Sequence, residues 1–140
     1  MSFTIDGTIV PGFGAADPNM GLQLPHFILV FPEIKRCRPG TINLQLDQPL
    51  QVNNPHYTTP PIRWTANAPP EQFSFLRIEF ECPIGSPARR AWIYIPHYSP
   101  HRSNLFLIEV IAEPIPEAAE GVRCRLRVSD QHRTSEVLIV

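Results

Sequence analysis

Proline is the residue that most constrains this chain, because it occupies 17 of the 140 positions, against about 5% in an average protein. Each proline fixes φ and lacks the N–H that a helix interior requires, so it ends or kinks a helix. The proline-free windows long enough for a helix are 71–82, 101–113 and 117–140, and their hydrophobic patterns are those of strands. The sequence therefore predicts a mostly β protein, with helix confined to short pieces within 26–36 and 115–120.

Alternation of apolar and polar residues marks the strongest strands. Residues 76–81 alternate Leu, Ile and Phe with Arg and Glu, and residues 122–128 alternate Val, Cys, Leu and Val with three arginines. This pattern is typical of strands with one solvated face, where the arginines would pair with Glu79 and Glu81 on a neighbouring strand. Residues 105–111 are apolar almost throughout, which predicts a strand buried on both sides. Further strands are expected at 3–10, 41–46, 91–95 and 134–140.

Many strands joined by irregular connections favour a small barrel over a sandwich. The length fits one domain, residues 1–140, in which residues 131–140 form an extra C-terminal strand or tail. The proline-rich segment 55–70 contains Ile62 and Trp64, which a free linker would not carry. We therefore expect this segment to be an ordered excursion from the barrel.

Charge and cysteine content exclude several classes of protein. The 12 basic and 13 acidic residues give a formal net charge of -1, which argues against a strongly basic nucleic-acid binder. Neither a membrane-spanning apolar run nor a secretory leader is recognisable. The three cysteines are widely spaced and form no C-x-x-C pair, so no zinc site or disulfide framework is expected. These features predict a cytoplasmic protein.

Two short segments carry residue types suited to phosphate chemistry. Gly12, Phe13 and Gly14 follow an expected strand, and glycines let backbone N–H groups approach a phosphate. An ordinary tight turn explains the same loop, and no helix pattern follows it. Thr41 and Asn43 are two residues apart, so on a strand they point to one face. Their oxygens could share a hard cation such as Mg²⁺, or they could simply belong to a polar strand face.

Considered together, three segments resemble the archaeal-type CTP-dependent riboflavin kinases. They are the Gly12–Gly14 loop, the run P-G-T-I-N-L-Q-L-D at 39–47 and the run I-E-V-I-A at 108–112. The similarity extends over about 4–128, except for 50–75. It implies a cradle-loop (RIFT-like) barrel with one or two short helices. It also implies Mg²⁺-dependent transfer of a phosphoryl group from a nucleotide, CTP or another, to riboflavin, which gives FMN.

The resemblance also implies roles for individual residues. Gly12, Phe13 and Gly14 would bind the nucleotide phosphates, and Arg102 would be a phosphate-facing arginine in the polar loop near the substrates. Thr41 and Asn43 would hold Mg²⁺ beside the transferring phosphoryl group. No catalytic residue is assigned by this comparison.

The chain departs from the family pattern at two places. The run after Gly14 is Ala-Ala-Asp, where the family continues with glutamate and glycine. Phe106 stands where the family commonly has an acid, and a phenyl ring can neither accept a proton nor ligate a metal. These departures favour a second hypothesis, a catalytically inactive barrel that binds a nucleotide or a flavin.

The apolar end of the chain, residues 137–140, favours a third hypothesis. Four apolar residues there are expected to form an edge strand in this chain or in a partner. The protein would then be an interaction module or a homo-oligomer that takes no small ligand.

Two other groups of residues have structural explanations. His97 and His101 have the spacing of a helical metal pair, but the neighbouring prolines exclude that helix, so we interpret them as loop residues. Arg89 and Arg90 precede Trp92 and Tyr94, which could stack on a base or a flavin. The start of a strand at the rim of the barrel explains the same residues equally well.

Overall fold

The structure is a computed structural model that describes residues 2–12, 16–98, 104–129, 132–133 and 138–140. Its elements, in chain order, are β1 (Ser2–Val10), α1 (Ala16–Val30), the 3-10 helix η1 (Pro32–Ile34), β2 (Ile42–Leu46), β3 (Leu50–Gln51), β4 (Tyr57–Thr58), β5 (Phe73–Glu81), β6 (Arg89–Pro96), β7 (Leu107–Ile111), β8 (Arg123–Ser129), β9 (His132–Arg133) and β10 (Leu138–Ile139).

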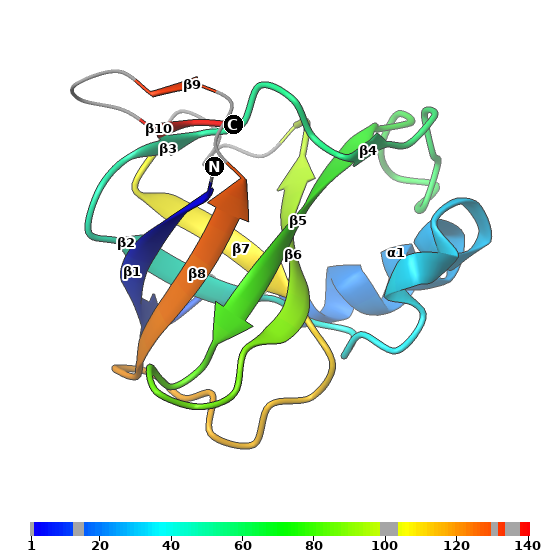
Figure 1. Ribbon diagram of the computed structural model, residues 1–140. Helices are drawn as coiled ribbons and strands as arrows, with labels where there is room; N and C mark the ends of the chain where they lie inside the picture. Colours follow the sequence, from blue (N-terminus) through cyan, green and yellow to red (C-terminus); the bar gives the residue numbers. More distant parts are fainter. Residues whose placement is uncertain (1, 13–15, 99–103, 130–131, 134–137) are drawn as a thin grey trace.

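Six of the described strands close into an antiparallel barrel, in the order β1, β2, β7, β6, β5 and β8 (Figure 1). Strand β8 closes the ring because it pairs with β1 along one edge and with β5, at residues 79–81, along the other. The short strand β4 extends the sheet from β5, outside the ring. The mostly β, single-domain barrel predicted from the alternation patterns is therefore confirmed.

The inside of the barrel is filled by the alternating residues of its strands. Leu76, Ile78 and Phe80 of β5 point inward, as the pattern predicted, and each is at least 96% buried. Other strands contribute aliphatic side chains and the Cys124 thiol, and Cys82, directly after β5, adds a second thiol to the same core: Ile5, Ile9, Leu44, Leu46, Ala91, Ile93, Ile108, Val110, Cys82, Cys124, Leu126 and Val128. This continuous apolar interior is the main source of hydrophobic stabilisation.

Helix α1 lies outside the barrel, beside β5 and β6 (Figure 1), and covers a second core. We call this core the aromatic layer and define it by Phe27, Phe31, Phe73, Phe75, Trp92 and Tyr94. The Phe27 ring is central, with its centroid 4.7 Å from that of Phe73 and 5.3 Å from that of Phe75. The outward faces of β5 and β6 are thus buried where α1 covers them, at Phe73, Phe75, Trp92 and Tyr94, whereas Arg77, Glu79 and Arg90 on the same faces are exposed.

The helix predictions were partly wrong. Helix α1 begins at Ala16, ten residues before the expected segment 26–36, so a helix does follow the glycine loop. It also contains two prolines, Pro18 and Pro25. Residues 115–120 form no helix. Pro18 lies in the first turn, where a backbone N–H has no helical acceptor, whereas Pro25 removes one hydrogen bond from the interior. Burial of the face formed by Met20, Leu24 and Phe27, at about 1.5–3 kcal/mol for each side chain, offsets that loss.

Two described segments outside the barrel pack against the rest of the chain, while residues 134–137 of the strand expected at 134–140 lie outside the described residues. In the proline-rich segment, Ile62 forms an antiparallel bridge with Glu71, and Trp64 packs against the aromatic layer. At the C-terminal end, β10 pairs with β3 and with β9, and Val140 is 2% exposed. The apolar tail therefore adds a strand to its own chain.

The arginines of β8 pair with carboxylates, although not all with the predicted ones. Arg127 contacts Glu79 at 3.5 Å, as expected. Arg125 instead pairs with Asp6 of β1, while the Glu81 carboxylate accepts a hydrogen bond from the Gly85 N–H. Strand β8 lies between β1 and β5, so its arginines can pair with acidic residues of either neighbouring strand.

Strand β7 begins at Leu107, two residues later than predicted, and Phe106 lies in the preceding turn with 44% of its surface exposed. The three cysteines are free thiols, and all three are buried. Within the described part of the chain, no helix is long and apolar enough to cross a membrane.

Candidate functional site

Three of the residues predicted to act on a nucleotide or a metal lie together in one cavity. Gly12, Thr41 and Asn43 line a hollow of about 320 Å³ at the end of β1 and the beginning of β2. Phe13, Gly14 and Arg102, the other residues of that prediction, lie outside the described residues. The cavity is completed by Arg38 and by residues at the end of β7 and in the following turn, among them Ala112, Glu113 and Glu120.

The proximity of Gly12 and Asn43 explains why a glycine stands at position 12. Strand β1 pairs with β2 so that Val10 lies opposite Asn43, and the chain then continues past the Asn43 side chain. A Cβ atom at position 12 would lie 2.6 Å from Asn43 Nδ2, so an alanine would displace the carboxamide. The glycine therefore leaves room for the Asn43 carboxamide beside the backbone of the loop.

Glu109 of β7 joins this group, and the sequence interpretation had not given it a role. It lies opposite Asn43 in the β2–β7 register, and the Thr41 hydroxyl donates a hydrogen bond to Glu109 Oε1 at 3.3 Å. The feature of the sequence that could have pointed to Glu109 is a single charged residue within the apolar run I-E-V-I-A. Identifying its neighbours required the strand register, which the sequence did not supply.

Thr41, Asn43 and Glu109 together form what we call the oxygen triad. A hydroxyl, a carboxamide and a carboxylate are ligands that suit a hard cation such as Mg²⁺, which keeps water or phosphate oxygens in its remaining positions. The described residues contain no cluster of three or more His, Cys, Asp or Glu that could hold a metal. The donor set fits Mg²⁺ bound together with a phosphate ligand rather than a soft transition metal.

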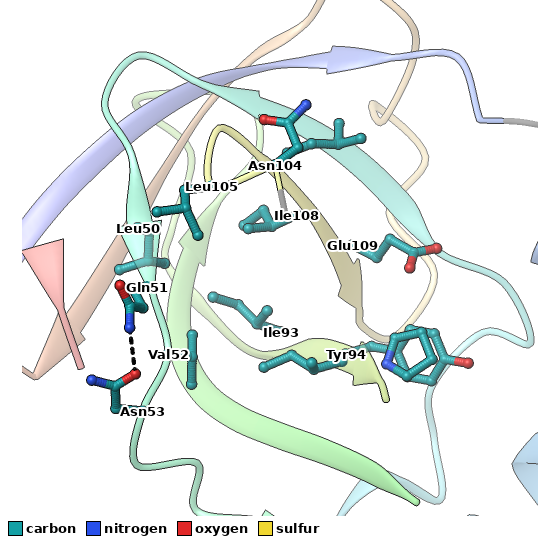
Figure 2. Close-up of a pocket in the computed structure, with 13 residues that line it drawn as sticks. Leu50, Gln51, Val52, Asn53, Ile93, Tyr94, Asn104, Leu105, Ile108 and Glu109 are labelled. Atoms are coloured by element: carbon teal, nitrogen blue, oxygen red, sulfur yellow. Dashed lines mark hydrogen bonds between the residues drawn. The ribbon is translucent and has the colours of Figure 1, made fainter. Parts of the chain in front are cut away.

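A second cavity, also of about 320 Å³, adjoins the triad through Glu109. Figure 2 shows Glu109 and Tyr94 on one side of this cavity, with Leu50 and Val52 on the opposite wall. Ile93 and Ile108 add further apolar surface, and amide groups stand at the rim, where Gln51 donates a hydrogen bond to Asn53 (Figure 2). An apolar cavity with a few polar groups is a common form of small-molecule site.

Helix α1 sets the position of Tyr94 in this second cavity. The Tyr94 hydroxyl donates a hydrogen bond to the buried Gln23 Oε1 of the helix. Burial raises the pKa of Tyr94 above its ordinary value, and the negative charges of Glu109 and Glu71 raise it further. Tyr94 is therefore a neutral hydrogen-bonded side chain at physiological pH, and it contributes shape rather than charge.

Other predicted site residues have structural roles. Arg89 begins β6 at the rim of the barrel, and Trp92 and Tyr94 are 5% and 7% exposed beneath α1. This burial leaves neither ring face open for stacking on a base. His97 lies in the turn after β6 and bonds Ser74 Oγ at 2.8 Å through Nε2, while His101 lies outside the described residues.

Neither the models of known protein families nor the curated protein sequences contain a match to this chain. The resemblance to the CTP-dependent riboflavin kinases stays a prediction that rests on the three sequence segments. The geometry of the two cavities and the oxygen triad is independent of that resemblance.

Proposed function

We propose that this protein is a Mg²⁺-dependent phosphotransferase that moves a terminal phosphoryl group from a nucleotide to a hydroxyl of a small acceptor. The observation that carries the proposal is the oxygen triad, in which Thr41 and Asn43 line one cavity and Glu109 lines the other. Direct phosphoryl transfer requires the donor and the acceptor to be held side by side, and the hydrogen bond from Thr41 to Glu109 links the two cavities here. The sequence resemblance names riboflavin as the first acceptor to test and CTP as the first donor.

The cavity that contains Gly12 is the donor side of the proposal. Arg38 supplies positive charge among its lining residues, beside the carboxylates of Glu113 and Glu120, and the backbone of Gly12 forms part of the same wall, where it could face phosphate oxygens. Thr41 and Asn43 would hold Mg²⁺ here through their side-chain oxygens. The cation would neutralise the charge that builds up on the phosphate oxygens.

The cavity that contains Tyr94 is the acceptor side. Its apolar walls suit a flat aromatic ring system, and Glu109 is the carboxylate at its inner border. The acceptor oxygen would form a new bond to phosphorus while the bond to the nucleoside diphosphate breaks. The hydroxyl proton would pass to the Glu109 carboxylate, which acts as general base.

The test is formation of FMN from riboflavin, Mg²⁺ and CTP, with ATP, GTP and UTP in parallel. Thr41→Ala and Asn43→Ala should each lower the rate by about 10–100-fold or more, the loss typical when a group that supports a metal is removed. Glu109→Gln should lower kcat more than it changes the KM of the nucleotide. The matched control is Thr65→Ala with Asn67→Ala, because these residues have the same spacing in an exposed turn.

The proposal fails if no nucleoside triphosphate yields FMN above a control without protein. One observation would then favour a barrel that binds a ligand without turnover: the exposed Phe106, which supplies no acid beside β7. That alternative predicts that a nucleotide or riboflavin at 100 times its Kd raises the free energy of unfolding by about 2.7 kcal/mol. No change in Tm with any of these ligands would exclude it as well.

A further inference from the structure

A third hollow, of about 620 Å³, lies on the outside of the barrel and shares no lining residue with the two cavities described above. Most of its lining residues come from β5, from β8, from the beginning of β6 and from the segment before β4, and they include Glu79 and Arg127, which lie opposite each other in the β5–β8 pairing. We call it the arginine groove and define it by its charged and titratable lining residues: His56, Arg77, Glu79, Arg89, Arg90 and Arg127.

The arginine groove concentrates positive charge in a chain whose net charge is -1. Four arginines line it, against the single carboxylate of Glu79. The His56 ring adds no charge at neutral pH, because burial and the neighbouring Arg77 lower its pKa, and its Nδ1 accepts a hydrogen bond from the Arg77 N–H. A concave surface lined by charge of one sign attracts ligands of the opposite sign.

Two of the arginines are held in place but remain available to a ligand. Arg77 is oriented by two hydrogen bonds to the Glu33 carboxylate of η1. Arg127 contacts Glu79 at 3.5 Å, and the two side chains are 54% and 66% exposed. Such an exposed pair contributes little to stability, so an anion of higher charge could replace Glu79 as the partner of Arg127.

The other two arginines have unused donors. Arg90 donates no hydrogen bond to the residues that the structure describes, although its charge acts on the Glu33 carboxylate together with that of Arg77. The Nε of Arg89 is buried and has no acceptor among those residues. A buried donor without a protein partner is uncommon in folded proteins, and a water molecule or a ligand oxygen could serve as its acceptor.

We propose that the arginine groove binds a small ligand that carries two or more adjacent anionic oxygen groups, either phosphates or carboxylates. The planar guanidinium group donates two parallel hydrogen bonds to either kind of oxyanion. The volume of the groove falls within the range of about 300–1,000 Å³ that is usual for small-molecule sites. This site is separate from the proposed phosphotransferase site.

The experiment is a calorimetric titration of the full chain without Mg²⁺, with pyrophosphate in one arm and citrate in the other. Both arms use the Thr41→Ala, Asn43→Ala variant, so that binding near the oxygen triad does not contribute. We expect saturable binding of at least one of the two anions, with a Kd of about 1 mM or below. The anion that binds more tightly identifies phosphate or carboxylate as the preferred group.

Adding Arg90→Gln and Arg127→Gln to that variant should raise the Kd by about tenfold or more. The matched control adds Arg36→Gln and Arg63→Gln instead, at two exposed arginines outside the groove, and should leave the Kd unchanged. Thermal unfolding of each variant verifies that the fold is intact. Absence of saturable binding, or equal weakening by both substitution pairs, would overturn the proposal, whatever the outcome of the FMN assay.

Discussion

The two cores of this protein share the strands β5 and β6 but are built differently. The inside of the barrel is mainly aliphatic and follows from alternation within each strand. The aromatic layer outside it depends on α1, a helix that packs from residues 16–30 onto strands more than forty positions away. The comparison teaches that a strand pattern can specify a barrel locally, whereas the covering layer exists only once distant segments meet.

Polar contacts in the aromatic layer also join α1 and η1 to strands β5 and β6. The Trp92 Nε1–H donates to Glu33 Oε1 at 2.8 Å, and Arg77 donates to the same carboxylate. Tyr94 and Gln23 make a corresponding bond between β6 and α1. These bonds give the helix a defined position, which the hydrophobic effect alone would not supply.

Among substitutions that test the difference between the two cores, Phe80→Ala should cause the largest loss in the free energy of unfolding. Phe80 is fully buried inside the barrel, and its truncation should lower the free energy of unfolding by about 3–5 kcal/mol. Because α1 packs on the outside of the same strands, circular dichroism and tryptophan fluorescence should report one common transition in urea. Fluorescence that persists after the strand signal has been lost would contradict this dependence.

Phe27→Ala should have a smaller effect and should separate the two cores. Phe27 contacts rings of β5 and β6, but it lies in the outer layer, where the helix can adjust, so we expect a loss of about 2–3 kcal/mol. Both tryptophans, Trp64 and Trp92, belong to or pack against the aromatic layer. Their fluorescence should therefore change at a lower urea concentration than the strand signal.

The control for Phe27→Ala is Leu29→Ala on the same helix. Leu29 is 82% exposed, so its truncation should change the free energy of unfolding by no more than about 0.5 kcal/mol. Because alanine favours a helix at least as well as leucine, an equal shift of the fluorescence transition by Leu29→Ala and Phe27→Ala would show that burial of the Phe27 ring is not what holds α1 in place.

The smallest effect should come from Glu33→Gln, which tests the polar contacts of the aromatic layer. The hydrogen bonds from Arg77 and Trp92 lower the pKa of Glu33 from its ordinary value of 4.5. Its ionised form therefore stabilises the fold above about pH 4.5, and this contribution is lost as the pH falls through the lowered pKa. Glu33→Gln should cost about 1 kcal/mol at pH 7 and less at acidic pH.

The measurement is the free energy of unfolding of both proteins between pH 3 and pH 7. Subtracting the two curves removes the contributions of Asp6 and Asp47, whose pKa values are also lowered by arginine partners. Glu117→Gln, in an exposed turn, serves as the control. A difference between wild type and Glu33→Gln that does not shrink at low pH would contradict the assignment of this contribution to the ionised carboxylate.

Strands could be predicted from the sequence where one face is polar, because Arg77 and Glu79 reveal the alternation of β5 directly. Helix α1 could not, because Pro18 and Pro25 outweighed a signal that was present: Met20, Leu24, Phe27 and Phe31 have the spacing of one helix face. The gain from burying that face depends on the rings of β5 and β6, which no local pattern contains.

The candidate site also contains residues that the sequence could place and residues that it could not. Thr41 and Asn43 could be placed on one face because they belong to one strand, and their separation of two residues sets their direction. Glu109 could not be joined to them, because its position opposite Asn43 is a matter of register between β2 and β7. The arginine groove brings together residues from four separated segments, so only the closed sheet shows it.

Strand β5 presents Phe73 and Phe75 to one core and Leu76, Ile78 and Phe80 to the other. Substitutions at odd and even positions of this strand therefore act on different parts of the molecule. A change in the helical cover would reach the second cavity through the bond between Gln23 and Tyr94, while the aliphatic interior of the barrel keeps its own packing. Ligand preference and architectural integrity can thus diverge independently during evolution or in laboratory redesign.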